Sequence, residues 1–420
     1  TDKSEEGESS GGALTSLFGN GADGDVSISN GNLNTSSYIN GRSAPDAEAF
    51  SVLEINNNVI TVFGTGTGGT AASSVGNSLA VGDAVILINM QGVSGSMTNV
   101  GNYEIVSVQS INGEQVTVSE IKKVYGETSN SDLSNQKVMI QRVPQYTNLT
   151  ITNQVTANSW DGQKGGLLMF MVKDTFVHSG SLVMNGSGFG GGPEVDGGKT
   201  PYGFQGESIT GTGLMLREAN LGGGGGGRSN GWASGGAGGG YGSNGSGGAN
   251  GSGGAGGYGG VTYGDATLTK IYLGSGGASG GEDNRDPQWY AKQGYAGGNG
   301  GGMIVVLANN ANISGVVSTR GNNGTSHGSA YGEDGGGGGG GSGGSVLIVS
   351  NQMITSPTIY SNGGNRGTVD HGGHGGNGGV GRVAIYSDVY NGSSTPGAYT
   401  DQVANFTAIT VDAGGGSTGA

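Results

Sequence analysis

The chain has 420 residues, of which 99 are glycine and only 7 are proline, a combination that excludes a collagen triple helix. Its formal net charge of −14 leaves no basic stripe for phosphates, so we expect no nucleic-acid partner. The absence of cysteine excludes disulfides and thiolate metal sites, and no apolar run is long enough for a membrane-spanning helix, so we expect no membrane insertion. Acidic, cysteine-free chains rich in Asn, Ser, Thr and Gly are typical of exported bacterial surface proteins, which predicts an extracellular location.

Residues 1–45 are polar and rich in turn-forming residues, and we interpret them as an extended N-terminal segment with little core of its own. Such a segment is suited to act as an inter-subunit arm that adds backbone hydrogen bonds to a sheet edge of a neighbour. Within it, Asp23 and Asp25 lie beside flexible glycines and are candidate ligands for weakly bound calcium. A solvated turn is the competing interpretation, because the spacing and the closing glutamate of a calcium-binding loop are missing.

Residues 46–146 alternate apolar and polar positions in short runs separated by turn-forming residues. This pattern predicts a small β-barrel or β-sandwich domain. The clearest pair of strands is YEIVSVQSI and EQVTVSEI. Asn112 and Gly113 join them and tolerate the positive φ angles of a two-residue hairpin turn.

An internal repeat fills residues 147–388. Its copies begin at Gly165, Gly301 and Gly343, and a truncated copy begins at Gly378. Each copy has two glycines, an apolar strand, a polar corner and a second strand, and a glycine-rich excursion follows the three full copies. Because the first strand is continuously apolar, both of its faces must be covered, and repeats of this kind stack into a β-solenoid.

The predicted fold is therefore all-β, with a small barrel or sandwich domain followed by a β-solenoid-like domain with polyglycine II-type helix insertions. Residues 389–420 are expected to form a C-terminal extension.

The glycine-rich excursions, residues 189–300, 321–342 and 362–379, carry a three-residue period. Every third residue from Gly236 to Gly260 is glycine. A polyproline II-type helix has three residues per turn, so this period leaves one edge of the helix without side chains and lets neighbouring backbones approach closely. We predict a lattice of such helices in place of the flexible linker that this composition ordinarily indicates.

In HGGHGGNGGVG, residues 371–381, the same period places His371, His374, Asn377 and Val380 on one edge. The two histidines are then about 9 Å apart along the helix, which is too far for easy chelation of one ion. We expect them to have a structural role.

Several motifs in order resemble large glycine-rich secreted proteins of myxobacteria and similar bacteria with complex surfaces. They are VGDAVILINMQG, VPQYTNLTI, ANSWDGQKGGLLMF, YGFQGES and YGDATLTKIYLGSGGASGG, and they span roughly residues 80–386. The resemblance implies an exported surface location and little about mechanism. In architecture alone, the chain also resembles polyglycine-helix tail-fibre adhesins of bacteriophages, which display recognition loops.

No catalytic constellation is present, since the sequence has no cysteine, no Gly-x-Ser-x-Gly elbow and no HExxH motif, and we do not expect an enzyme. Glu282, Asp283 and Asp286 form a second acidic cluster that is a candidate for weak calcium binding, again with a solvated turn as the competing interpretation. No other cofactor is expected.

Aromatic residues in the excursions are the better functional candidates. Trp289, Tyr290 and Trp232 are candidate contacts with a partner or a sugar.

The sequence favours a non-enzymatic extracellular structural protein that assembles with copies of itself into a bacterial surface filament or layer. The alternative is an adhesin or phage receptor-binding tip that displays loops on a polyglycine scaffold. In that case its partners would be cell-surface glycans or receptors.

Overall fold

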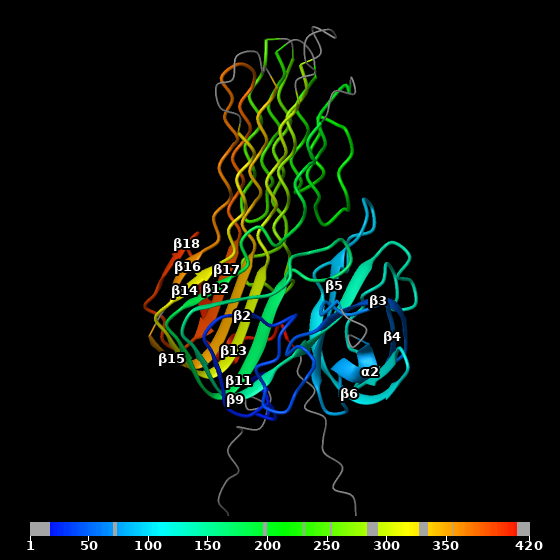
Figure 1. The fold of residues 1–420 in the computed structure, drawn as a ribbon, viewed down its shortest axis with the longest axis vertical. Helices are drawn as coiled ribbons and strands as arrows, with labels where there is room; N and C mark the ends of the chain where they lie inside the picture. Colours follow the sequence, from blue (N-terminus) through cyan, green and yellow to red (C-terminus); the bar gives the residue numbers. More distant parts are fainter. Residues whose placement is uncertain are drawn as a thin grey trace, which may run out of the picture.

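The repeated strands pair in parallel with the matching strands of the next copy, which builds the two sheets of a β-solenoid (Figure 1). The computed structural model describes residues 17–69, 74–195, 200–229, 232–252, 254–283, 293–326, 335–355 and 357–409. The larger sheet contains, in spatial order, β1 (Val26–Ile28), β9 (Gln145–Ile151), β11 (Leu167–His178), β13 (Met303–Ile313), β15 (Ser345–Thr355), β17 (Arg382–Ser387) and β19 (Tyr399–Asp401). The smaller sheet contains β18 (Ser393–Thr395), β16 (Thr358–Tyr360), β14 (Val316–Ser318), β12 (Ser181–Val183), β10 (Gln154–Thr156) and β2 (Gly31–Asn32).

A closed antiparallel barrel lies beside the solenoid, so the predicted all-β fold is confirmed. Its strands are, in spatial order, β3 (Ala49–Asn56), β4 (Val59–Phe63), β7 (Gln115–Val118), β6 (Tyr103–Asn112), β5 (Ala84–Gln91) and β8 (Lys137–Val143). The short helix α2 (Val75–Ser78) precedes β5, and a 3₁₀ turn, η1 (Val403–Asn405), follows β19.

The predicted hairpin joins β6 and β7, but its turn lies one residue further along the chain than expected. Asn112 pairs with Gln115, so the two turn residues are Gly113 and Glu114. Gly113 alone takes the positive φ, +60°, because Asn112 remains in the ladder.

The N-terminal segment differs from the predicted extended arm. β1 pairs with β9 and β2 pairs with β10, so residues 26–32 form the first coil of the chain's own solenoid. The barrel is therefore an insertion between the first and second coils. Strands of three and two residues carry no periodic signal, which is why the sequence pattern missed this coil. The part of the predicted arm before residue 17 lies outside the described residues.

The C-terminal extension also differs from its prediction, because it continues the solenoid. β18 and β19 add the outermost strands to their sheets by pairing with β16 and β17. After β19, Val403 and Phe406 are buried in the hydrophobic cluster that covers the larger sheet.

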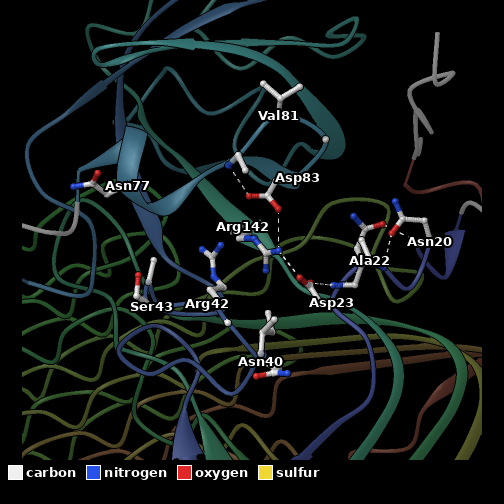
Figure 2. Close-up of a pocket in the computed structure, with 16 residues that line it drawn as sticks. Asn20, Ala22, Asp23, Asn40, Arg42, Ser43, Asn77, Val81, Asp83 and Arg142 are labelled. Atoms are coloured by element: carbon white, nitrogen blue, oxygen red, sulfur yellow. Dashed lines mark hydrogen bonds and ion pairs between the residues drawn. The ribbon is translucent and has the colours of Figure 1, made fainter. Parts of the chain in front are cut away.

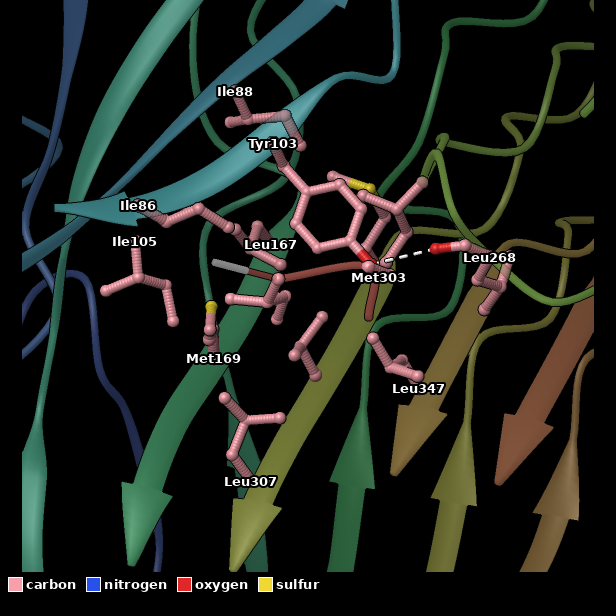
Figure 3. Close-up of a cluster of buried hydrophobic side chains, with 14 of the residues drawn as sticks. Ile86, Ile88, Tyr103, Ile105, Leu167, Met169, Leu268, Met303, Leu307 and Leu347 are labelled. Carbon is pink, nitrogen blue, oxygen red and sulfur yellow. Dashed lines mark hydrogen bonds between the residues drawn. The ribbon is translucent and has the colours of Figure 1, made fainter. Parts of the chain in front are cut away.

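The long strands are covered on both faces, as their apolar sequences predict. On β11, Leu168 and Phe170 point into the solenoid core, while Leu167 and Met169 belong to a second cluster on the outer face of the sheet. Figure 3 shows the barrel residues that complete this second cluster. They are Ile86, Ile88, Tyr103 and Ile105. The barrel is therefore joined to the solenoid through a shared apolar core.

His178, at the end of β11, is a neutral side chain buried in the solenoid wall. It is 0% exposed, and its ring stacks on Phe176 at a centroid distance of 5.7 Å. Neither ring nitrogen has a hydrogen-bond partner among the residues that the structure describes. Burial lowers the pKa of His178 to about 4, which lies below the value near 6.5 of an exposed histidine.

This pKa shift predicts that folding stability falls as the pH falls from about 6.5 to about 4. The sign follows because the unfolded chain binds the proton in this window and the folded chain does not. The His178 contribution to this loss is about 3 kcal/mol when complete. Denaturant unfolding at several pH values should show a shallower pH dependence for His178→Phe than for the wild type. Parallel pH profiles for the two proteins would contradict the prediction.

Candidate functional site

The glycine-rich excursions rise from one end of the solenoid as a bundle of extended, mutually hydrogen-bonded segments (Figure 1). We call this set the glycine bundle. It comprises residues 189–195, 203–207, 222–227, 233–251, 256–261, 274–281, 294–301, 320–326, 335–344, 361–368 and 373–381.

The central segment, residues 335–344, donates its N–H groups to three different neighbours in strict rotation. On one edge the N–H groups donate to residues 275–281, in the pairs Gly336 to Gly281, Gly339 to Ala278 and Ser342 to Ser275. On the second edge they donate to residues 373–379, in the pairs Gly337 to Gly373, Gly340 to Gly376 and Gly343 to Gly379. On the third edge they donate to residues 319–325, in the pairs Gly338 to Thr325, Gly341 to Asn322 and Gly344 to Thr319. Their N···O distances lie between 2.8 and 3.2 Å. A rotation of three residues per turn is the geometry of a polyglycine II-type helix.

The tract between Gly236 and Gly260 has the predicted threefold winding, but it forms three antiparallel helices joined by turns. Residues 233–242 run toward the solenoid, residues 243–251 run away from it, and residues 256–261 return. The bonds of the first helix rotate among three neighbours, again with period three. Gly235 and Gly238 donate to the second helix, at Ala249 and Ser246. Gly236 and Gly239 donate to the central segment, at Gly337 and Gly340. Ala237 and Gly240 donate to residues 222–227, at Gly225 and Gly222.

The close approach of backbones leaves no room for a side chain at the central positions. A Cβ atom on Gly339 would lie 1.9 Å from the Ala237 carbonyl oxygen, and one on Gly338 would lie 1.9 Å from that of Ala296. Real Cβ contacts are never this short. Glycine at these positions is therefore required by packing.

The solenoid sets the register of the bundle. β13, β15 and β17 are neighbours in the larger sheet, and the helices that lead into them, 294–301, 335–344 and 373–381, are neighbours in the same order. The hydrogen bonds between these helices continue those between the strands without a break. The pairing of the strands therefore aligns each helix with its neighbour.

The base of the bundle is fixed to the barrel and to the solenoid by side chains. The Glu207 carboxylate accepts hydrogen bonds from Gln91 Nε2 at 2.9 Å, Trp160 Nε1 at 3.0 Å and the Gly190 N–H at 2.7 Å. Tyr103 of the barrel donates its hydroxyl to the Leu268 carbonyl oxygen at 2.8 Å (Figure 3).

The predicted edge of residues 371–381 carries side chains outward, as expected. The N–H groups of Gly373, Gly376 and Gly379 donate inward to residues 233–239. His374 is half-buried and accepts a hydrogen bond from the Val369 N–H through Nδ1 at 3.2 Å, which is a structural contact.

The bundle helices that run toward the solenoid begin at the end of the bundle far from it (Figure 1). Trp232 immediately precedes the helix 233–242 at this end. Its ring centroid lies 6.3 Å from that of His371, and it is 42% exposed. We call this end the tip. Of the predicted partner contacts, Trp232 lies at the tip, whereas Trp289 and Tyr290 fall outside the described residues.

The predicted calcium ligands near the N-terminus are engaged in other contacts. Asp23 Oδ1 lies 2.6 Å from Arg142 Nη2, and its other oxygen accepts the Gln145 N–H at 2.6 Å (Figure 2). Asp25 accepts a hydrogen bond from Asn148 Nδ2 at 2.9 Å. The guanidinium group thus neutralises the carboxylate that the sequence offered to a cation.

The second acidic cluster is only partly within the described residues. Glu282 and Asp283 are buried beside the bundle, and Asp286 falls outside the described part. In the residues that the structure does describe, no group of three or more His, Cys, Asp or Glu side chains is placed to hold a metal ion.

A pocket of about 580 Å³ that sequence reasoning missed lies between the barrel and the first solenoid coil (Figure 2). Arg142, on β8, is buried in its wall and pairs with Asp83 at 2.8 Å in addition to Asp23. Arg42 lies in the loop that connects β2 to the barrel and also lines the pocket. The sequence feature that could have indicated this pocket is Arg142, a charged residue inside the apolar strand KVMIQRV.

Comparisons with known proteins give no family for this chain. No family model and no curated protein matches it. Among solved structures, the tailspike of Acinetobacter baumannii bacteriophage AP22, in complex with A. baumannii capsular saccharide, has 9% identity and a TM-score of 0.16 over 85% of this chain. The tailspike protein of Pseudomonas phage LKA1 has 11% identity and a TM-score of 0.16 over 88% of this chain.

The chain spans 56% of the first of these structures and 67% of the second. Likenesses this low carry no argument about function, and the resemblance to glycine-rich myxobacterial proteins stays a prediction. No helix in the described part of the chain is long and apolar enough to cross a membrane.

The packing of the bundle predicts that Gly339→Ala destabilises the protein by about 3 kcal/mol. Overpacking a close-packed site typically costs about 1–3 kcal/mol, and the upper end applies here because the added Cβ would meet backbone atoms. Gly247→Ala is the matched control, because a Cβ there meets nothing closer than the Gly257 carbonyl oxygen at 3.3 Å. Its expected effect is within about 1 kcal/mol. Chemical denaturation of both variants measures the difference, and equal stabilities would show that the helices are not packed in this way.

Proposed function

We propose that this protein is a non-enzymatic extracellular recognition protein whose glycine bundle presents a binding surface at its tip. The observation that carries the proposal is the threefold hydrogen-bonding of residues 335–344 to three neighbours. A helix whose backbone groups are hydrogen-bonded on every edge is held in one conformation, whereas a glycine linker in water is flexible. The bundle is thus suited to fix the position of a surface at its end.

The arrangement of the excursions supports a display function. They follow β12, β14 and β16, and their described helices extend to one end of the bundle, away from the shared core of barrel and solenoid (Figure 1). Loops held on a rigid scaffold are the usual place for binding residues, since their sequences vary without disturbing the scaffold.

The chemistry at the tip supports recognition of a surface partner. Trp232 exposes a large, flat aromatic side chain beside His371. An exposed tryptophan offers apolar area and a hydrogen-bond donor together, which suits it to contact a sugar ring or a protein hot spot. We favour cell-surface glycans or receptors as partners.

Self-assembly into a filament, the first hypothesis from the sequence, stays a prediction. Within one chain, Leu33 and Tyr38 pack on the solenoid core next to its first coil. Tyr390 and Ala398 do the same next to its last coil. Apolar side chains of the same chain thus extend its core at the first and last coils.

Trp232→Ala tests the assignment of the tip. We expect it to weaken binding of the purified chain to an immobilised panel of bacterial surface polysaccharides and host-cell envelopes by at least about tenfold. Circular dichroism and thermal unfolding should be unchanged, because the side chain is not part of a hydrophobic core cluster.

Phe63→Ala is the control, since Phe63 is an aromatic residue on the barrel that is 67% exposed. It should leave binding unchanged. Equal binding by Trp232→Ala and the wild type would refute the tip as the contact surface. Regular filaments of the wild type in negative-stain microscopy would favour self-assembly instead.

A further inference from the structure

The pocket between the barrel and the first solenoid coil contains a guanidinium group, that of Arg42, which forms no ion pair with the residues that the structure describes. Arg42 donates through Nε and Nη2 to the Pro45 carbonyl oxygen and through Nη2 to that of Ser78. Its Nη1 has no hydrogen-bond partner among the described residues, and none of the ion pairs there involves Arg42. The Nη1 group of Arg42, which lines the pocket, is therefore available to a ligand.

The nearby carboxylates are already in use. Asp23 and Asp83 both approach Arg142 Nη2, at 2.6 and 2.8 Å (Figure 2). The Asp83 Oδ2 atom also accepts the Ala80 N–H at 2.8 Å. Because Arg142 holds both carboxylates, neither forms a close pair with Arg42.

The electrostatic setting of Arg42 agrees with this geometry. Burial is the largest cause that lowers the pKa of its guanidinium group, and the charge of Arg142 lowers it further, while the charges of Asp83, Asp23 and Asp46 raise it. A bound anion would act in the same direction as these carboxylates, through direct contact with the guanidinium group.

The rim of the pocket is rich in uncommitted polar side chains. Asn40, Ser43 and Asn77 line it, are exposed, and make no side-chain hydrogen bond within the described structure (Figure 2). Amide and hydroxyl groups both donate and accept, which matches the hydroxyl groups of a sugar. The volume of about 580 Å³ is within the range of small-ligand pockets.

We propose that this pocket binds a sugar acid, with its carboxylate on the Nη1 group of Arg42 and its hydroxyl groups on the polar rim. The ligand class follows from pairing one planar cation with several neutral hydrogen-bonding groups. This site is separate from the tip and does not rest on the function proposed for it.

Calorimetric titration of the full chain with glucuronate, glucose and acetate tests the proposal. Glucuronate should bind at least tenfold more tightly than either of the others, because it alone has both the carboxylate and the hydroxyl groups. Arg42→Gln should weaken glucuronate binding at least tenfold and leave glucose binding nearly unchanged. Equal affinities for glucuronate and glucose would overturn the role of Arg42, and equal affinities for glucuronate and acetate would overturn the role of the rim.

Asn77→Ala provides a second variant, since Arg42 also braces its own loop and its removal can disturb folding. Asn77 is exposed and makes no side-chain hydrogen bond, so its replacement leaves the fold intact. It should weaken glucuronate binding about three- to tenfold, the effect of one lost hydrogen bond. Asn153→Ala, at an exposed solenoid corner outside the pocket, should have no effect. Unchanged glucuronate binding in Asn77→Ala would overturn the proposed pose.

Discussion

The structure depends on one constraint, which is that every buried peptide group in the glycine bundle must find its partner on a neighbouring chain segment. Ordering glycine is costly, at about 1–2 kcal/mol per residue or more. A polyglycine II-type helix has no internal hydrogen bonds, so an isolated one gains nothing to offset this cost. The bundle is stable only as a lattice, and the lattice requires side-chain-free edges such as those of Gly338 and Gly339.

The solenoid satisfies this constraint by acting as a template. Its parallel strands pair in register, with Met303 opposite Ser345 and Ser345 opposite Arg382. This register aligns the helices that directly precede the strands, so that they lie side by side in the bundle. The barrel then covers the outer face of the same sheet, and Glu207 joins all three parts at the base. A tip anchored in this way keeps its position relative to the body, which suits the recognition role that we propose for it.

Local sequence patterns predicted the features that arise from local physics. These are the hairpin between β6 and β7, the doubly covered strands and the three-residue period of the bundle. The patterns did not show that the tract 236–260 folds into three antiparallel helices, because the glycine period continues unbroken through its turns. Nor did they reveal the ion pair of Asp23 with Arg142, whose partners are 119 residues apart and meet only through the insertion of the barrel.

Amide hydrogen exchange in the native protein tests the central claim most directly. Each N–H of residues 336–343 is assigned a carbonyl partner inside the bundle. The account therefore predicts protection close to that of β11 and β13 in the solenoid core. Exchange of these amides at the rates of an unstructured glycine chain would contradict it, since no lattice would then exist to hold the tip in place.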